Sequence, residues 1–162
     1  MISIRNRQFE TNSSSVHVLV IPKDTNIHIP KVVSLTGGEY GWENEEYWDT
    51  LNYFYQACVD AGRESVAQFF AYLKEKGVEE IHAPELHWVK SKYGDYEYAE
   101  NNDGGIDHSG EIPLHYMFAN ESLLDRFLFG DSFVVTGNDN SDECPDEDDY
   151  DEDQYDTILK YN

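Results

Sequence analysis

Residues 16–21 constrain the fold of this chain more than any other stretch of the sequence. Apart from His17 the run is apolar and rich in β-branched side chains, a pattern that predicts a buried β-strand. Residues 2–9 alternate apolar and polar side chains, which predicts another strand. Residues 11–15, rich in Asn and Ser, predict a tight turn between the two.

Apolar residues recur at intervals of three and four in three later stretches, which predicts helices over 48–61, 63–77 and 120–130. Further short strands are predicted over 27–35, 79–82, 85–92 and 132–137. This order favours an α+β fold, with a mainly antiparallel sheet packed with about three helices. At 162 residues, the chain is expected to form a single globular domain over residues 1–137.

The sequence is strongly acidic, with 33 acidic and 11 basic residues and a formal charge of −22. Residues 138–156 hold 11 of the acids and no Lys or Arg, yet the rest of the chain still has 22 acids against 11 bases. Such a protein repels nucleic acids and anionic membranes and attracts basic protein surfaces or cations. We therefore expect no direct binding to DNA or RNA and no membrane partner.

Residues 138–156 combine dense like charge with few apolar side chains, so we expect a low-complexity acidic tail that is disordered unless bound. Residues 157–162 could return to the domain as an edge strand. The two cysteines, Cys58 and Cys144, form no CxxC motif. No apolar run approaches the ~20 residues of a membrane span, and no signal peptide is visible. These features predict a cytoplasmic protein with reduced cysteines.

Known catalytic signatures, such as nucleotide-binding glycine loops and zinc-ligand arrays, are absent from the sequence. Four polar clusters at the ends of predicted strands are the candidates for a site. The first cluster, residues 12–17, could hold an anion on the side-chain amide of its asparagine and the hydroxyls of its serines, with His17 as acid, base or ligand. The same residues are also typical of a simple hairpin turn. The anion-binding candidates here are Asn12, Ser13, Ser14 and Ser15.

The second cluster, residues 37–42, has three glycines around Glu39, Tyr40 and Trp42. Glu39 could be a site carboxylate, while Tyr40 and Trp42 could anchor a partner. The alternative is a glycine-rich loop that leads into the following helix, with Trp42 packed beneath it.

The third and fourth clusters supply further polar side chains. Asp107 and His108 could form an acid–base pair or bind a divalent metal, provided that the neighbouring glycines bend the chain, or they could belong to a surface loop. Asn138 and Asp139 follow the strand predicted over 132–137, so they could contribute to an anion site or a metal site, or simply form a turn.

Several of these segments occur together in a known group of proteins. "RNRQFETNSSSVHVLVI", "GGEYGWE", "LNYFYQA", "GGIDHSGE" and "RFLFGDSFVVTGNDN" resemble an uncharacterised group of small proteins encoded by bacteriophages of Gram-positive hosts, marked by an F-E-T-N-S-S-S-x-H signature. The resemblance covers most of residues 1–140. It implies that the four clusters form one shared site, and that the protein acts in the host bacterial cytoplasm. The matching positions are Glu10, Asn12, Ser13, Ser14, Ser15, His17, Glu39, Gly41, Trp42, Asp107, His108, Asn138 and Asp139.

The first functional hypothesis is an inhibitor. A small acidic phage protein suits binding to a bacterial host protein with a basic, nucleic-acid-binding surface, such as a CRISPR nuclease, another defence effector or the transcription machinery. No cofactor is required. Aromatic anchors at Tyr40 and Trp42 would add affinity to the charges. The acidic partner-binding candidates are Asp146, Glu147, Asp148, Asp149, Asp151, Glu152 and Asp153.

The alternative hypothesis is a small metal-assisted hydrolase that acts on a nucleotide or phosphodiester. His17, Glu39, Asp107 and His108 would be catalytic, and the Ser-rich loop with Asn138 would hold the phosphate. Asp107, His108 and Asp139 would bind a divalent metal, which would also offset the acidic field that repels such substrates. A virion accessory protein without any such site is a third interpretation.

Overall fold

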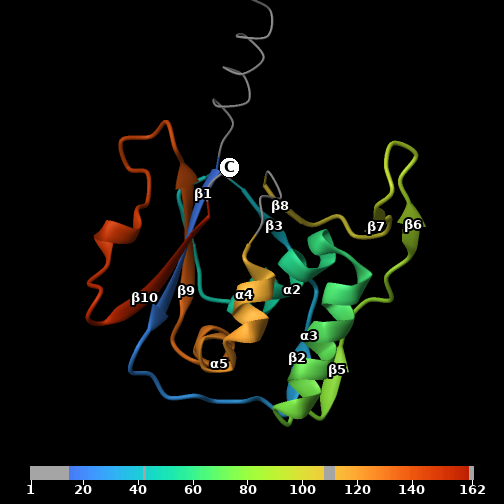
Figure 1. The fold of residues 1–162 in the computed structure, drawn as a ribbon, viewed down its shortest axis with the longest axis horizontal. Helices are drawn as coiled ribbons and strands as arrows, with labels where there is room; N and C mark the ends of the chain where they lie inside the picture. The colour runs from blue at the N-terminus through green and yellow to red at the C-terminus, as the bar shows by residue number, and fades with distance from the viewer. Residues whose placement is uncertain (1–14, 42, 108–111, 161–162) are drawn as a thin grey trace, which may run out of the picture.

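The computed structural model describes residues 15–41, 43–107 and 112–160 of the chain. It confirms the predicted α+β class, with helices packed on a mainly antiparallel sheet (Figure 1). The elements are β1 (Ser15–Pro22), β2 (Val32–Ser34), β3 (Glu39–Tyr40), β4 (Glu45–Tyr47), α2 (Thr50–Ala61), α3 (Arg63–Glu75), β5 (Glu80–His82), β6 (Trp88–Lys90), β7 (Glu97–Ala99), β8 (Gly105–Ile106), α4 (Leu114–Ala119), α5 (Glu121–Phe129), β9 (Phe133–Asn138), the 3-10 turn η1 (Glu147–Asp149) and β10 (Tyr155–Lys160).

The main sheet has the strand order β10-β1-β9-β4, and each neighbouring pair is antiparallel. β1 is buried along almost its whole length because it has a strand on each side and cover on both faces. Leu19 and Ile21 point into the main core, whereas Val16, Val18 and Val20 point to the opposite face. The apolar run at 16–21 therefore forms a central strand, as its composition predicts.

Helix α2 forms the centre of the main core, between the sheet and α3 (Figure 1). Seven consecutive residues, 53–59, are buried, so α2 is covered on more than one side. The helices predicted over 48–61, 63–77 and 120–130 are present as α2, α3 and α5. The short helix α4 was not expected from the sequence.

The remaining strands form three small two-stranded sheets beside the main one. β2–β5 and β3–β8 are parallel, and β6–β7 is an antiparallel hairpin. Within the strand predicted over 27–35, only Val32–Ser34 is extended in a ladder. The strand predicted over 2–9 lies outside the described residues. Among the described residues, no helix has both the length and the apolar character needed to cross a bilayer.

A disordered acidic tail over 138–156 is not confirmed. Residues 139–154, which we call the acidic cover, connect β9 to the outer strand β10 and lie over the second face of the main sheet. Cys144 and Tyr150 pack against the cluster formed by Val16, Val18 and Val20. These few apolar side chains bury against the sheet and offset the entropy of ordering the segment, an effect that overall composition does not reveal.

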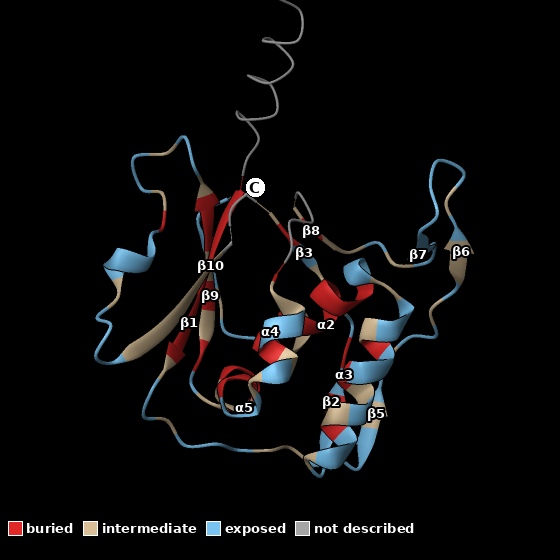
Figure 2. Ribbon diagram, viewed as in Figure 1, coloured by how far each residue is buried: buried red, intermediate tan, exposed pale blue. Residues whose placement is uncertain are grey.

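The carboxylates of the acidic cover point outward. In Figure 2 the η1 turn at the left is exposed, whereas β1 in the sheet beside it is buried. η1 is closed by its own acids: Asp146 accepts from the Asp148 N–H, and the Asp149 carboxylate accepts from the Asp146 N–H. The cover thus has an apolar underside and a charged outer side.

Candidate functional site

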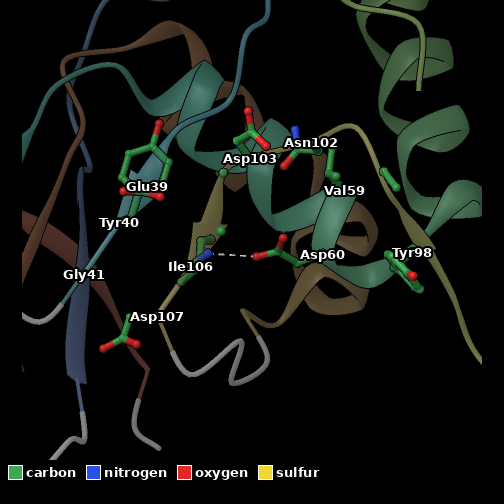
Figure 3. Close-up of a pocket in the computed structure, with 13 residues that line it drawn as sticks. Glu39, Tyr40, Gly41, Val59, Asp60, Tyr98, Asn102, Asp103, Ile106 and Asp107 are labelled. Carbon is green, nitrogen blue, oxygen red and sulfur yellow. Dashed lines mark hydrogen bonds between the residues drawn. The ribbon is translucent and has the colours of Figure 1, made fainter. Parts of the chain in front are cut away.

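A pocket of about 700 Å³ lies where β3, β8, β7 and the end of α2 meet (Figure 3). Four carboxylates and five apolar or aromatic side chains line the pocket. None of the lining residues is a lysine or an arginine. The acids are Glu39, Asp60, Asp103 and Asp107; the apolar and aromatic residues are Tyr40, Val59, Tyr98, Ala99 and Ile106.

Gln56, a fully buried residue of α2, holds the loops around this pocket together. Its Oε1 accepts a hydrogen bond from the Gly38 N–H at 3.3 Å. Its Nε2 donates to Asp60 at 2.9 Å and to Asn102 at 3.0 Å. Asp60 in turn accepts from the Ile106 N–H at 2.9 Å, the contact drawn in Figure 3. One amide side chain of α2 therefore holds the two loops at Gly38 and Asn102, and its neighbour Asp60 on the same helix holds Ile106.

Glycines allow the loops to approach Gln56 closely. A Cβ on Gly104 would lie 2.3 Å from Gln56 Oε1 and 2.6 Å from the Gly38 carbonyl oxygen. Gly37 has a φ of +69°, which other residues rarely adopt. No sequence pattern marks Gln56, Asp60 or Asn102 as site residues, because polar residues on a helix or loop normally face solvent.

The four predicted clusters do meet in space through residues that are described. Glu39 and Asp107 line the same pocket, and the Asp107 N–H donates to the Tyr40 carbonyl at 2.7 Å. Ser15 Oγ donates to the Asp107 carbonyl at 3.2 Å. Asn138 lies directly opposite Ser15 in the pairing of β1 with β9. The ends of β1, β3, β8 and β9 thus converge.

His17 does not belong to the polar lip of this pocket. Its side chain is fully buried, and Nδ1 lies 2.6 Å from the Tyr53 hydroxyl. The Tyr53 ring packs edge-on against Tyr40, with ring centroids 4.9 Å apart. Burial raises the pKa of the Tyr53 phenol well above its ordinary value, and Tyr40 adds to the shift, so the phenol stays protonated. In this position His17 forms a hydrogen bond with Tyr53 inside the core.

Other candidates lie elsewhere or outside the described residues. Asp139 lies on the exposed turn that begins the acidic cover, where it accepts a hydrogen bond from Asn140 Nδ2. The acids proposed for partner binding, Asp146–Asp149 and Asp151–Asp153 in sequence, lie on the cover rather than in the pocket. Asn12, Ser13, Ser14, Trp42 and His108 lie outside the described residues.

The residues that are described contain no group of three or more His, Cys, Asp or Glu side chains placed to hold a metal ion. Burial raises the pKa of the Cys58 thiol, which keeps it in the unreactive protonated form. The pocket suits binding better than covalent chemistry. Its carboxylates favour a cation, and its apolar walls favour the aliphatic stem of an amine or guanidinium group.

Comparison of the chain with models of protein families, with curated proteins and with solved structures finds no match.

Proposed function

We propose that this chain is a phage-encoded inhibitor that binds a basic, nucleic-acid-binding surface of a bacterial protein and blocks it. The observation that carries the proposal is the ordered acidic cover. Residues 139–154 contain ten acids and no Lys or Arg, and they are held on the sheet from beneath. Because the cover is already ordered, a partner would bind it without the entropic cost of fixing a flexible tail.

The distribution of basic side chains supports the same proposal. In the described part of the chain, five of them are already held in ion pairs: Lys23, Lys31, Arg63, Lys76 and Arg126. The acidic cover and the pocket contain no Lys or Arg of their own. No base within either surface offsets its acidic charge, so both surfaces would steer a basic partner toward the chain.

Trp48 provides an aromatic anchor beside the cover. Its side chain is 59 % exposed, and its ring lies 4.6 Å from that of Phe133. Phe133 also contacts Tyr150 of the cover, with ring centroids 6.1 Å apart. An exposed tryptophan next to a dense group of carboxylates matches the composition of binding hot spots, in which aromatic residues provide affinity and charges provide rate and specificity.

A charge-neutralised cover tests the proposal. The variant carries Glu147→Gln, Asp148→Asn, Glu152→Gln and Asp153→Asn, amides of nearly the same shape. Tagged wild-type chain should capture a nucleic-acid-binding protein from bacterial lysate at low salt and release it at high salt. The variant should bind the purified partner about tenfold or more weakly.

A matched control removes the same charge elsewhere, through Glu64→Gln, Glu75→Gln, Glu85→Gln and Asp95→Asn, all at exposed positions. This control should retain the partner, and wild-type chain should displace nucleic acid from it. A partner that binds both variants equally, or that still binds nucleic acid in the complex, would contradict the proposal.

The hydrolase alternative has less support. It requires His17 beside Glu39 and Asp107, but His17 is fully buried against Tyr53 and does not line the pocket. The pocket carboxylates would also repel a phosphate ester. The inhibitor is therefore the function that the geometry favours.

A further inference from the structure

Within the part of the chain that the structure describes, the outer edge of β10 has backbone groups available for another strand. In an antiparallel pair, alternate residues direct both backbone groups toward the partner strand, and the residues between direct them away. Lys23 N–H donates to the Gln154 carbonyl at 2.8 Å, which sets this alternation where β10 meets β1. Asp156 and Ile158 therefore bond to β1, whereas Thr157 and Leu159 direct their N–H and C=O groups to the open edge.

The position of β10 in the sheet agrees with this assignment. It is the outer strand of the main sheet in the described part of the chain. The Tyr155 N–H, which also points outward, is already bonded to the Asp151 carbonyl at 2.9 Å. The available edge therefore starts after Tyr155 and includes Thr157 and Leu159.

This edge forms one side of a slot of about 710 Å³. Tyr116 and Ala119 of α4 and Ser122 of α5 line the slot from one face of the sheet, and Glu147 of η1 lines it from the other. A fifth strand would lie about 4.8 Å from β10, between the helices and the acidic cover.

The charges of the slot favour a basic occupant. Glu121, Glu147 and Asp156 line it together with a single base, Arg126. The Arg126 guanidinium is held by Asp156 at 2.9 Å and donates to the Pro22 carbonyl at 3.1 Å. The slot is therefore acidic even with Arg126 present, and a second copy of this −22 chain would be repelled from it.

We propose that an extended, basic segment of the partner protein adds to β10 as a fifth strand of the main sheet. The assignment of this segment to the inhibited protein rests on the proposed function. Backbone hydrogen bonds to Thr157 and Leu159 would provide affinity, and the acidic walls would select lysine and arginine side chains.

The test uses the full chain, labelled with ¹⁵N, and a synthetic capped peptide of alternating lysine and valine. Wild-type chain should show amide shifts along β10 on titration. Thr157→Pro replaces the outward N–H by a ring carbon but costs no bond to β1, and edge strands tolerate proline. Binding should weaken about tenfold, the effect of one or two lost backbone hydrogen bonds.

Thr157→Val, which keeps the N–H, is the matched control and should bind as wild type does. A second arm leaves the protein unchanged, so that a folding defect cannot imitate the result. It uses two N-methylated peptides, one methylated at the lysine amides and the other at the valine amides. One of the two peptides should fail to bind. An absence of shifts in β10, equal binding by Thr157→Pro, or equal binding of a glutamate–valine peptide would overturn the inference.

Two further outcomes separate this inference from the proposed function. If the neutralised cover loses the captured partner but Thr157→Pro keeps it, the inhibitor proposal stands and the added strand is wrong. If wild-type chain is a dimer that Thr157→Pro converts to a monomer, the slot pairs two copies of the chain and the partner segment is likewise wrong.

Discussion

Gln56 shows how much of the pocket depends on single side chains. Its side-chain amide accepts a hydrogen bond from the Gly38 N–H and donates hydrogen bonds to Asp60 and Asn102. The close approach of Gly104 is part of the same arrangement, since no larger residue fits between Gln56 and the Gly38 carbonyl.

Gly104→Ala should therefore destabilise the protein. The added methyl group would meet a buried side-chain oxygen and a backbone oxygen, and neither can move without breaking a hydrogen bond. We expect the free energy of unfolding, measured by urea denaturation, to fall by roughly 1–3 kcal/mol. Gly105→Ala is the matched control, because a Cβ there meets nothing within 4 Å. Equal stability of the two variants would show that the loops are not held as described.

Sequence patterns say least about which single side chains build the pocket. Glu39, Asp107 and Ser15 could be selected because their loops are rich in glycine and polar residues. Gln56 and Asp60 lie in a helix whose periodicity gives no sign that its polar residues are buried or bonded. His17 could be selected as the polar residue near the start of the predicted strand, but strand alternation directs its side chain into the core.

At the scale of elements, the helices were predictable because α2, α3 and α5 repeat apolar residues over nine or more positions. α4 has six residues and follows a proline, too short for its periodicity to be recognised. The two-residue strands β3 and β8 have no pattern at all. Composition does not reveal that the acidic cover is ordered, because Cys144, Pro145 and Tyr150 are diluted among acids, although they decide where the segment lies.

Tyr150→Ala should release the acidic cover while leaving the main sheet intact. The Tyr150 ring contacts Phe133 and Tyr155, and removing a partly buried aromatic side chain should cost roughly 1–3 kcal/mol. Hydrogen exchange followed by mass spectrometry should show faster exchange in residues 139–154 and little change in β1 and β9. Tyr93→Ala, at a side chain that is 95 % exposed, should leave exchange unchanged. Unaltered exchange in the Tyr150 variant would mean that the cover is held by other contacts.

At the scale of the whole molecule, buried tyrosines should make stability depend on alkaline pH. Burial raises the pKa of the Tyr53, Tyr40 and Tyr72 phenols; Asp49 adds to the shift of Tyr40, and the hydrogen bond to Asp125 adds to that of Tyr72. In the unfolded chain these phenols ionise near their ordinary pKa of about 10. Above that pH the unfolded state binds fewer protons than the folded state, so stability must fall as the pH rises.

Urea denaturation between about pH 8 and about pH 11 should show a flat region followed by a decline, with each phenol that stays protonated contributing about 1.4 kcal/mol per pH unit. The Lys76 ammonium acts in the same direction, because hydrogen bonds to Asp125 and Glu121 raise its pKa despite burial. Tyr53→Phe should be less stable at neutral pH, since it loses the contact with His17, but its decline should be shallower. A stability that does not change over this range would contradict the assignment of these phenols to the core.

The order of strands in the main sheet also bears on how the chain is made. β1, near the N-terminus, lies between β9 and β10, which begin only at Phe133 and Tyr155. During synthesis, α2 and α3 can form early from neighbouring residues, but β1 has neither of its partners until β9 and β10 have been made. A nascent chain therefore carries an apolar strand without its two sheet partners while the intervening residues are made, and the pairing of β9 and β10 with β1 completes and protects the sheet.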